Sequence, residues 1–317
     1  MKWVVRILTA LVLLGVAVWL LRPGVGEIAF DADAIGDDPV AYLAAQESRF
    51  DDIVEGTQKR VVWAGDPGAR TDWVVVYVHG FSASSEEIRP VPDQVAAALG
   101  ANLYFTRLEG HGRDGAAMAE SSAEAWLRDF DEGLAIARRL GDRVLVMSAS
   151  TGGTIAALAS ARGRDVDAQV MVSPNFGVQA AGAFLLTLPG ARSWVPLLVG
   201  ETRSFEAENP AHAKYWTTRY PTEAVVPMAL SVRAAKAAAL QRITTPALVI
   251  FSEDDQVVRP EATRAAMARW GGPVTLEPVS PPPGNAPSNH VLAGDILSPD
   301  MTAPVTDMIL DWVRALP

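Results

Sequence analysis

The chain has 317 residues, of which 49% are hydrophobic and 20% are charged, and its net charge at neutral pH is −10. This composition supports one large folded domain and excludes a disordered chain. The absence of cysteine excludes a disulfide scaffold, a thiolate nucleophile and a cysteine-ligated zinc. Residues 1–22 contain no acid, so the remainder of the chain is more acidic still. Such a surface repels phosphate backbones and disfavours nucleic acid as a partner.

The N-terminus carries an apolar segment. Residues 7–21 contain no charge, and Lys2 and Arg6 precede them. With its apolar flank this stretch would form a helix about 28 Å long, close to the thickness of the hydrocarbon core. We therefore predict an N-terminal transmembrane helix, a signal-anchor at 1–22. The basic end would stay in the cytoplasm, which makes the chain a single-pass membrane protein with an extracytoplasmic domain. The alternative is a cleaved signal peptide and a secreted product.

A polar connector at 23–60 separates this segment from the main domain, 61–317. In the main domain, short apolar runs alternate with amphipathic stretches, which is typical of βαβ units in a parallel sheet covered on both faces. Ser121 and Glu124 have the spacing of a capping box at the start of one helix. The predicted strands are 61–63, 73–78, 102–105, 143–148, 168–173, 247–252 and 274–279, and the predicted helices include 39–50, 153–162, 260–270 and 302–316.

One segment interrupts this alternation. Residues 180–240 lie between two predicted strands and are rich in proline and aromatic residues. The segment is too long for an ordinary connection between a helix and a strand. Because open α/β sheets bind ligands at the carboxyl edge of their strands, we expect this insertion to form a lid over that edge.

A serine stands at the junction between a predicted strand and a predicted helix. The sequence from Ser148 to Gly153 reads Ser-Ala-Ser-Thr-Gly-Gly, with Ser150 at the apex. This is close to the G-x-S-x-G pattern of a nucleophile elbow, in which a tight turn exposes the serine hydroxyl. The turn demands small residues two positions before and after the serine. Gly152 meets this demand, whereas Ser148 replaces the usual glycine.

The strand 73–78 ends in His79-Gly80-Phe81. A glycine here lets the backbone turn, so that the Phe81 N–H can point at a developing oxyanion. The Thr151 N–H, at the start of the helix after Ser150, would be the second donor, where the helix dipole also helps.

A general base and its orienting acid should follow the later strands. Three acids, at 253–255, follow the strand 247–252, and we select Asp255 as the acid, with Asp254 next. His290 follows the last strand and is the candidate base, whereas His111 lies in a glycine-rich turn and is expected to be structural. Ser150, Asp255 and His290 then occur in the chain order known for Ser-Asp-His hydrolases.

Taken together, these motifs resemble those of α/β-hydrolase-fold serine hydrolases, in the carboxylesterase and monoacylglycerol-lipase-like branch. The resemblance covers about 61–317. It implies Ser150 as nucleophile, His290 as base, Asp255 as acid and the Phe81 and Thr151 amides as the oxyanion hole. The motifs that carry it are HGF at 79–81, RLEGHG at 107–112, SASTGG at 148–153, SEDDQVV at 252–258 and SNHVLAGD at 288–295.

The predicted reaction is hydrolysis of an acyl ester or monoglyceride-like substrate through an acyl-enzyme intermediate. The aromatic insertion and the predicted membrane segment favour a substrate with an apolar acyl chain. Acyl transfer and amide or peptide hydrolysis on the same three residues stay open, as does a catalytically silent, membrane-tethered binding protein. No metal-ligand cluster and no phosphate-binding glycine loop occurs in the sequence, so no cofactor is implied.

Overall fold

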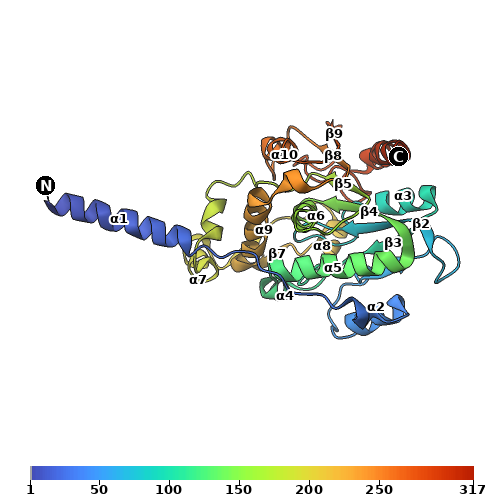
Figure 1. Cartoon of the computed structure of the whole chain (residues 1–317), viewed down its shortest axis with the longest axis horizontal. Coiled ribbons are helices and arrows are strands. Elements are labelled where there is room, and N and C mark those ends of the chain that lie inside the picture. Colours follow the sequence, from blue (N-terminus) through green and yellow to red (C-terminus); the bar gives the residue numbers. More distant parts are fainter. Residues whose placement is uncertain (1) are drawn as a thin grey trace.

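The computed structural model describes residues 2–317, apart from the side chains of residues 11, 12, 14 and 17. Its centre is a seven-stranded sheet in the order β1-β3-β2-β4-β5-β8-β9 (Figure 1). The edge strand β1 pairs antiparallel with β3, and the other neighbours are parallel. The strands are β1 Arg60–Val62, β2 Thr71–Val78, β3 Asn102–Phe105, β4 Gly141–Ala149, β5 Ala168–Val172, β8 Ala247–Phe251 and β9 Val274–Pro278.

The sheet is buried on both faces, which explains why its central strands are continuously apolar. In β2, Val74 and Val76 belong to the core on one side of the sheet, whereas Val75 and Tyr77 belong to the core on the other side. Alternate residues of a strand point to opposite faces, so a strand covered twice needs apolar residues at every position. The predicted α/β architecture with a mostly parallel sheet is confirmed.

Helices from the connections cover the two faces. Both α5 and α6 contribute to the first core, and α3 and α11 contribute to the second. The cap of α5 lies one residue later than predicted: the Ser122 hydroxyl accepts the Ala125 N–H, and Glu124 instead accepts the Gly26 N–H. These helices are α2 Pro39–Glu47, α3 Val91–Leu99, α4 Gly115–Glu120, α5 Ala123–Leu140, α6 Thr151–Ala161, α10 Pro260–Met267 and α11 Thr302–Arg314.

The insertion between β5 and β8 folds into short helices and one pair of strands. Its longest helix, α9, packs against α6 (Figure 1). Strands β6 and β7 form a separate antiparallel pair. The elements are the 3₁₀ helices Ala183–Thr187, Thr222–Ala224 and Leu240–Arg242, the helices α7 Ala191–Val199, α8 Pro210–Tyr215 and α9 Val225–Ala237, and the strands β6 Thr202–Ser204 and β7 Arg219–Pro221.

The predicted transmembrane helix at 1–22 is wrong. The N-terminal helix α1 spans Lys2–Leu20 and projects from the rest of the chain (Figure 1). Among the described residues, no helix combines the length and the apolar character that a bilayer crossing needs. Lys2 and Arg6 lie inside α1 and leave only 14 uncharged helical residues after them. These residues extend about 21 Å, against about 30 Å of hydrocarbon.

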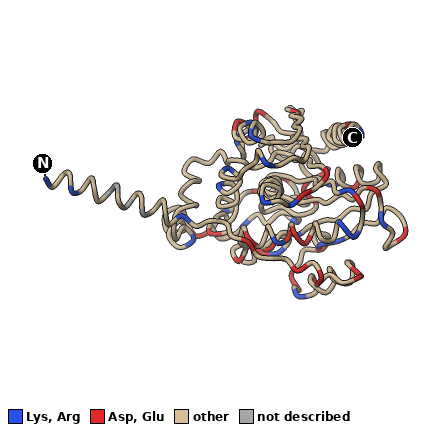
Figure 2. Tube along the Cα trace, viewed as in Figure 1, with Lys and Arg blue, Asp and Glu red and all other residues tan. Residues whose placement is uncertain are grey.

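Two predictions that depended on this helix are therefore also wrong: the single-pass membrane localisation, and the membrane as a partner through the N-terminus. Residue 1 of the predicted segment lies outside the described residues. Figure 2 shows the acidic residues on the body of the molecule, beyond α1.

Candidate active site

Ser150 occupies a strained turn between β4 and α6. Its backbone has φ +47° and ψ −116°, a conformation that residues other than glycine rarely adopt. Neighbouring segments hold the turn, because the Ser150 N–H donates to the Val172 carbonyl at 3.0 Å and its own carbonyl accepts the Asn175 N–H at 3.0 Å. The strand, the turn and the helix therefore present Ser150 at the carboxyl edge of the sheet, as a nucleophile elbow does.

The two small positions around this turn are occupied in different ways. A Cβ atom on Gly152 would lie 2.2 Å from the Val78 carbonyl oxygen, so only glycine fits there. Ser148 lies within β4, between β2 and β5, and is buried. Its hydroxyl donates to the Val170 carbonyl of β5 at 3.2 Å. The hydroxyl that departs from the glycine pattern is thus accommodated by the neighbouring strand.

Three side chains from three different loops meet beside this turn. His290 Nε2 lies 2.9 Å from Ser150 Oγ, and His290 Nδ1 lies 2.8 Å from Asp255 Oδ2. A carboxylate can only accept, so Nδ1 carries the proton and Nε2 is free to accept the Ser150 hydroxyl. This chain of hydrogen bonds can transfer a proton away from Ser150 and hold the imidazole in one tautomer.

Asp255 differs from its neighbour Asp254 in burial and in partners. Asp255 is 4% exposed, and its Oδ1 accepts the N–H groups of Val257 and Val258 at 2.8 and 2.9 Å. Asp254 is exposed, and the carboxylate that bonds His290 Nδ1 is that of Asp255. The loop that carries Asp255 is tied to the histidine loop, since the Gln256 N–H donates to the Ser288 carbonyl at 2.9 Å.

Gly80 brings the end of β2 against Ser150. A Cβ atom on Gly80 would lie 3.0 Å from Ser150 Cβ and 2.7 Å from Glu87 Oε1. Two N–H groups near this contact, those of Phe81 and Thr151, donate to no acceptor within residues 2–317. Both predicted oxyanion donors are therefore available to a ligand.

Two buried side chains hold the peptide groups on either side of Gly80. The His79 ring accepts the Leu108 N–H at Nε2, so its Nδ1 carries the proton and donates to the Gly80 carbonyl at 2.9 Å. Burial keeps the pKa of His79 well below its ordinary value, with His111 contributing, so the ring is neutral. On the other side, Glu87 Oε2 accepts the Gly80 N–H at 2.6 Å and the Tyr77 hydroxyl at 3.1 Å.

Sequence reasoning missed Glu87. It follows Glu86 in a polar loop, where a pair of acids normally indicates a solvated turn, yet Glu87 is only 3% exposed. Burial raises the pKa of Glu87, against the opposing effects of the Gly80 N–H, the nearby His290 ring and the Tyr77 hydroxyl. The sequence offered one indication of its role, because Glu87 lies only seven positions after Gly80.

The two other histidines lie apart from the Ser150 hydroxyl. His111 is buried in an aromatic cluster with His79, Phe81 and Trp126, where burial lowers its pKa to about 4. His212 packs on Trp216 within the insertion. Within residues 2–317, no group of three or more histidine or acidic side chains is arranged to hold a metal ion.

The fold and this site define a class, the serine hydrolases of the α/β-hydrolase fold. Residues 69–277 match the family described as serine aminopeptidase, S33, and the chain belongs to that family. The resemblance to carboxylesterases and monoacylglycerol lipases is also confirmed: the chain is 25% identical over 186 residues to the thermostable monoacylglycerol lipase of Bacillus sp. (strain H-257). That match covers 59% of this chain and 72% of the lipase.

Solved structures agree on the fold. One of the metagenome-derived lipolytic enzymes LipS and LipT superposes with a TM-score of 0.68 at 20% identity, covering 83% of this chain and all of that one. The monoacylglycerol lipase of Paleococcus ferrophilus superposes with a TM-score of 0.59 at 17% identity, covering 81% of this chain and 98% of that one. The chain is thus an enzyme, a serine hydrolase of the lipase and esterase type.

Proposed function

We propose that the protein hydrolyses carboxylic esters of the monoacylglycerol type through an acyl-enzyme formed on Ser150. The observation that carries the proposal is the position of His290, whose ring lies 2.9 Å from Ser150 Oγ and 2.8 Å from Asp255 Oδ2. This contact gives a neutral imidazole the geometry of a general base for the serine hydroxyl.

In the first step, His290 Nε2 takes the Ser150 proton while Oγ attacks the ester carbonyl carbon. The tetrahedral intermediate collapses as His290 returns that proton to the leaving alcohol, which breaks the ester bond and leaves an acyl group on Ser150. Water then attacks the acyl-enzyme with the same proton path, and the carboxylic acid is released. Asp255 orients the imidazole and stabilises its charged form.

The Phe81 and Thr151 N–H groups serve as the oxyanion hole in this proposal. Both lack a protein acceptor within the described residues, and Gly80 packs directly against Ser150. His79 and Glu87 hold the peptide groups that flank Gly80, so we assign them as positioning residues for the Phe81 donor. Donors that are fixed before the charge develops stabilise the transition state most strongly.

The insertion supports an apolar acyl substrate. The Phe81 ring packs edge-on against Tyr220 of β7 at a centroid distance of 5.3 Å. Leu186 and Met228, both from the insertion, join the same apolar cluster. The segment 180–240 therefore forms apolar walls next to the proposed oxyanion hole, as a lid over an acyl-binding site would. The lipase among its relatives acts on monoacylglycerol, which agrees with this assignment.

A covalent probe tests the nucleophile. The wild-type chain should be labelled by a fluorophosphonate and should hydrolyse a monoacylglycerol, whereas Ser150→Ala should lose labelling and about 10⁶-fold of its activity. Ser148→Ala, two residues away and also buried, is the matched control and should still be labelled. Labelling of Ser150→Ala, or its absence from the wild type, would overturn the assignment.

The family description favours one competing function, cleavage of an amide bond. An aminoacyl p-nitroanilide should therefore be compared with p-nitrophenyl esters of increasing chain length on the same enzyme. We expect the esters to have the higher kcat/KM. A higher kcat/KM for the anilide would assign the chain as a peptidase and reject the ester proposal.

A further inference from the structure

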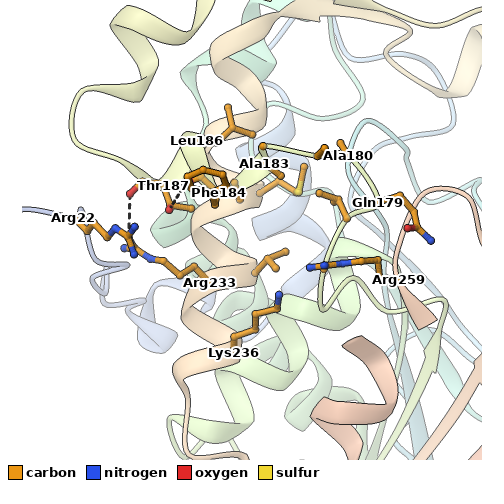
Figure 3. A pocket seen from close by; sticks show the side chains of 17 residues that line it. Arg22, Gln179, Ala180, Ala183, Phe184, Leu186, Thr187, Arg233, Lys236 and Arg259 are labelled. Carbon is orange, nitrogen blue, oxygen red and sulfur yellow. Dashed lines mark hydrogen bonds between the residues drawn. The ribbon is translucent and has the colours of Figure 1, made fainter. Parts of the chain in front are cut away.

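A cavity is lined largely by residues of the insertion. It has a volume of about 510 Å³ and is bordered by the segment 177–187, by α9 and by the side chains of Arg22 and Arg259 (Figure 3). Neither Ser150 nor His290 lines it, although Leu186 and Met228 lie between this cavity and the apolar cluster at Phe81.

Positive charge gathers in this cavity without a counter-charge. The residues that line it include four cations, Arg22, Arg233, Lys236 and Arg259, and no acid. None of the four forms an ion pair with an acid in residues 2–317. The rest of the chain carries a large excess of acid. A bound anion would therefore neutralise cations that no acidic side chain of the described residues neutralises.

The cations converge in two pairs. A Cβ atom on Gly177 would lie 3.0 Å from Arg259 Nη2 and 3.2 Å from Lys236 Nζ. These two charged nitrogen atoms therefore lie within about 6 Å of each other. Figure 3 shows both directed into the same space. Partial burial and the neighbouring Arg259 lower the pKa of Lys236, and partial burial and Arg22 lower the pKa of Arg233. An anion between the groups of a pair would relieve this repulsion.

Donors in the cavity also lack partners. Arg233 donates to the Thr187 and Pro23 carbonyls. By contrast, the Nε atoms of Arg22 and Arg259 are buried and have no hydrogen-bond partner within the described residues. Buried donors are normally satisfied, and oxygen atoms of a carboxylate or phosphate group would satisfy guanidinium donors.

Apart from Gln179 and Thr187, the other walls of the cavity are apolar. They include Leu186 on the 3₁₀ helix Ala183–Thr187 and Met228 and Val232 on α9. Met228 and Leu186 also contact the apolar cluster around Phe81. A ligand that fills this space must therefore combine a charged head with a hydrocarbon part.

We propose that this cavity binds an anionic amphiphile, with its carboxylate or phosphate group between Arg259 and Lys236 and its alkyl chain along Leu186 and Met228. The proposal goes beyond the proposed function, because binding does not require Ser150. Two sources share this chemistry: the fatty acid that ester hydrolysis releases, and a phosphate-bearing lipid.

The cavity is connected to the loop that holds the catalytic acid. The Arg259 N–H donates to the Gly177 carbonyl at 2.7 Å, and Gln179 Nε2 donates to the Asp255 carbonyl at 2.8 Å. A ligand held between Arg259 and Lys236 therefore lies next to two segments, at Gly177–Gln179 and at Arg259, that are bonded to each other and to the Asp255 loop. Its binding should change the rate of ester hydrolysis.

Binding is measured on the full chain carrying Ser150→Ala, so that failure of the catalytic proposal does not affect the result. Decanoate, decyl phosphate, inorganic phosphate and decanol are titrated calorimetrically below their micellar concentrations. We expect decanoate or decyl phosphate to bind with one site per chain, at least tenfold more tightly than either decanol or inorganic phosphate. The tighter of the two charged ligands identifies the source. Equal affinity for decanol, or no binding of either charged ligand, would overturn the proposal.

A charge-reversal variant locates the site. Lys236 is exposed on α9, so Lys236→Glu should fold normally, which the thermal midpoint checks. It should weaken binding at least tenfold. Lys214→Glu is the matched control, because Lys214 is exposed on α8 and does not line the cavity. Binding that Lys236→Glu leaves unchanged, or that Lys214→Glu weakens as much, would place the ligand elsewhere.

Discussion

Glu87 Oε2 accepts a hydrogen bond from the Gly80 N–H at 2.6 Å, where the chain leaves β2 and passes Ser150. A buried acid thus holds the backbone next to the proposed oxyanion hole, and the Tyr77 hydroxyl donates to the same oxygen. This contact links the activity and the pH dependence of stability through one side chain.

Substitutions of Glu87 should separate these two effects. Glu87→Gln keeps an oxygen acceptor for Gly80 and should retain activity within a few-fold. Glu87→Ala removes the acceptor, so the Gly80 peptide loses its orientation and kcat should fall about tenfold with little change in KM. Steady-state kinetics on a p-nitrophenyl ester check this. A change in KM with kcat unaltered would contradict the positioning role.

The same carboxyl group should make stability depend on pH. Burial raises the pKa of Glu87, so the folded chain keeps this proton at pH values where the unfolded chain has lost it. The stabilisation is complete below the ordinary glutamate range and declines as pH rises through the folded pKa, at about 1.4 kcal/mol per pKa unit. Urea unfolding of the wild type and Glu87→Gln at several pH values should show that the variant loses less stability as pH rises. Parallel curves would refute this.

Asp255 and Asp254 offer a direct test of the orienting acid. Asp255→Asn should lower kcat by about 10³- to 10⁴-fold, because an amide no longer fixes the His290 tautomer. Asp254→Asn, at the exposed neighbouring position, should retain activity within about twofold. Equal losses in the two variants would show that the loop conformation matters rather than the contact with His290.

Ser148→Gly would restore the usual glycine of the elbow. We expect it to lower the free energy of unfolding by about 1–2 kcal/mol, because β4 gains a flexible residue and the hydrogen bond to Val170 is lost. The catalytic geometry depends on Ser150 and Gly152, so kcat should change by less than about threefold. A large gain in activity would mean that Ser148 strains the turn.

Gly152→Ala should be far more damaging than a typical glycine substitution. Its Cβ atom would lie 2.2 Å from the Val78 carbonyl oxygen, which forces β2 and α6 apart. We expect a loss of about 3 kcal/mol or more in the free energy of unfolding. Gly65→Ala is the control: a Cβ atom there meets nothing within 4 Å, and stability should be nearly unchanged. Similar effects at the two sites would disprove the close contact.

His111 should make the fold sensitive to acid. Burial lowers its pKa to about 4 from 6.5, so below pH 6.5 the unfolded chain takes up a proton that the folded chain rejects. This contribution is fully present above the unfolded pKa and is lost as pH falls towards 4. Between pH 7 and pH 5 the loss is about 2 kcal/mol. In His111→Asn, the stability difference between these two pH values should shrink by about that amount, as urea unfolding would show.

Local patterns along the chain were enough to predict most of the sheet. A strand covered on both faces must be apolar throughout, and β4, β5 and β8 each lie within two residues of their predicted ends. The same reasoning failed for α1, where the predicted span included the flank that carries Arg6, and no described helix is long and apolar enough to cross a membrane. The helix cap lies at Ser122 and not at Ser121, and Glu124 bonds Gly26, a partner distant in sequence that a local pattern does not show.

The alternation of strands and helices and the serine at the turn can be read from the sequence alone, because these features depend on neighbouring residues. The order of Ser150, Asp255 and His290 can be read there too, but their contact depends on segments far apart in the chain. Only the tertiary structure decided that Glu87 is buried beside Gly80 and that Lys236 and Arg259 share one cavity. An isolated charged residue is most stable in water. Whether it stays there depends on which distant segments fold over it.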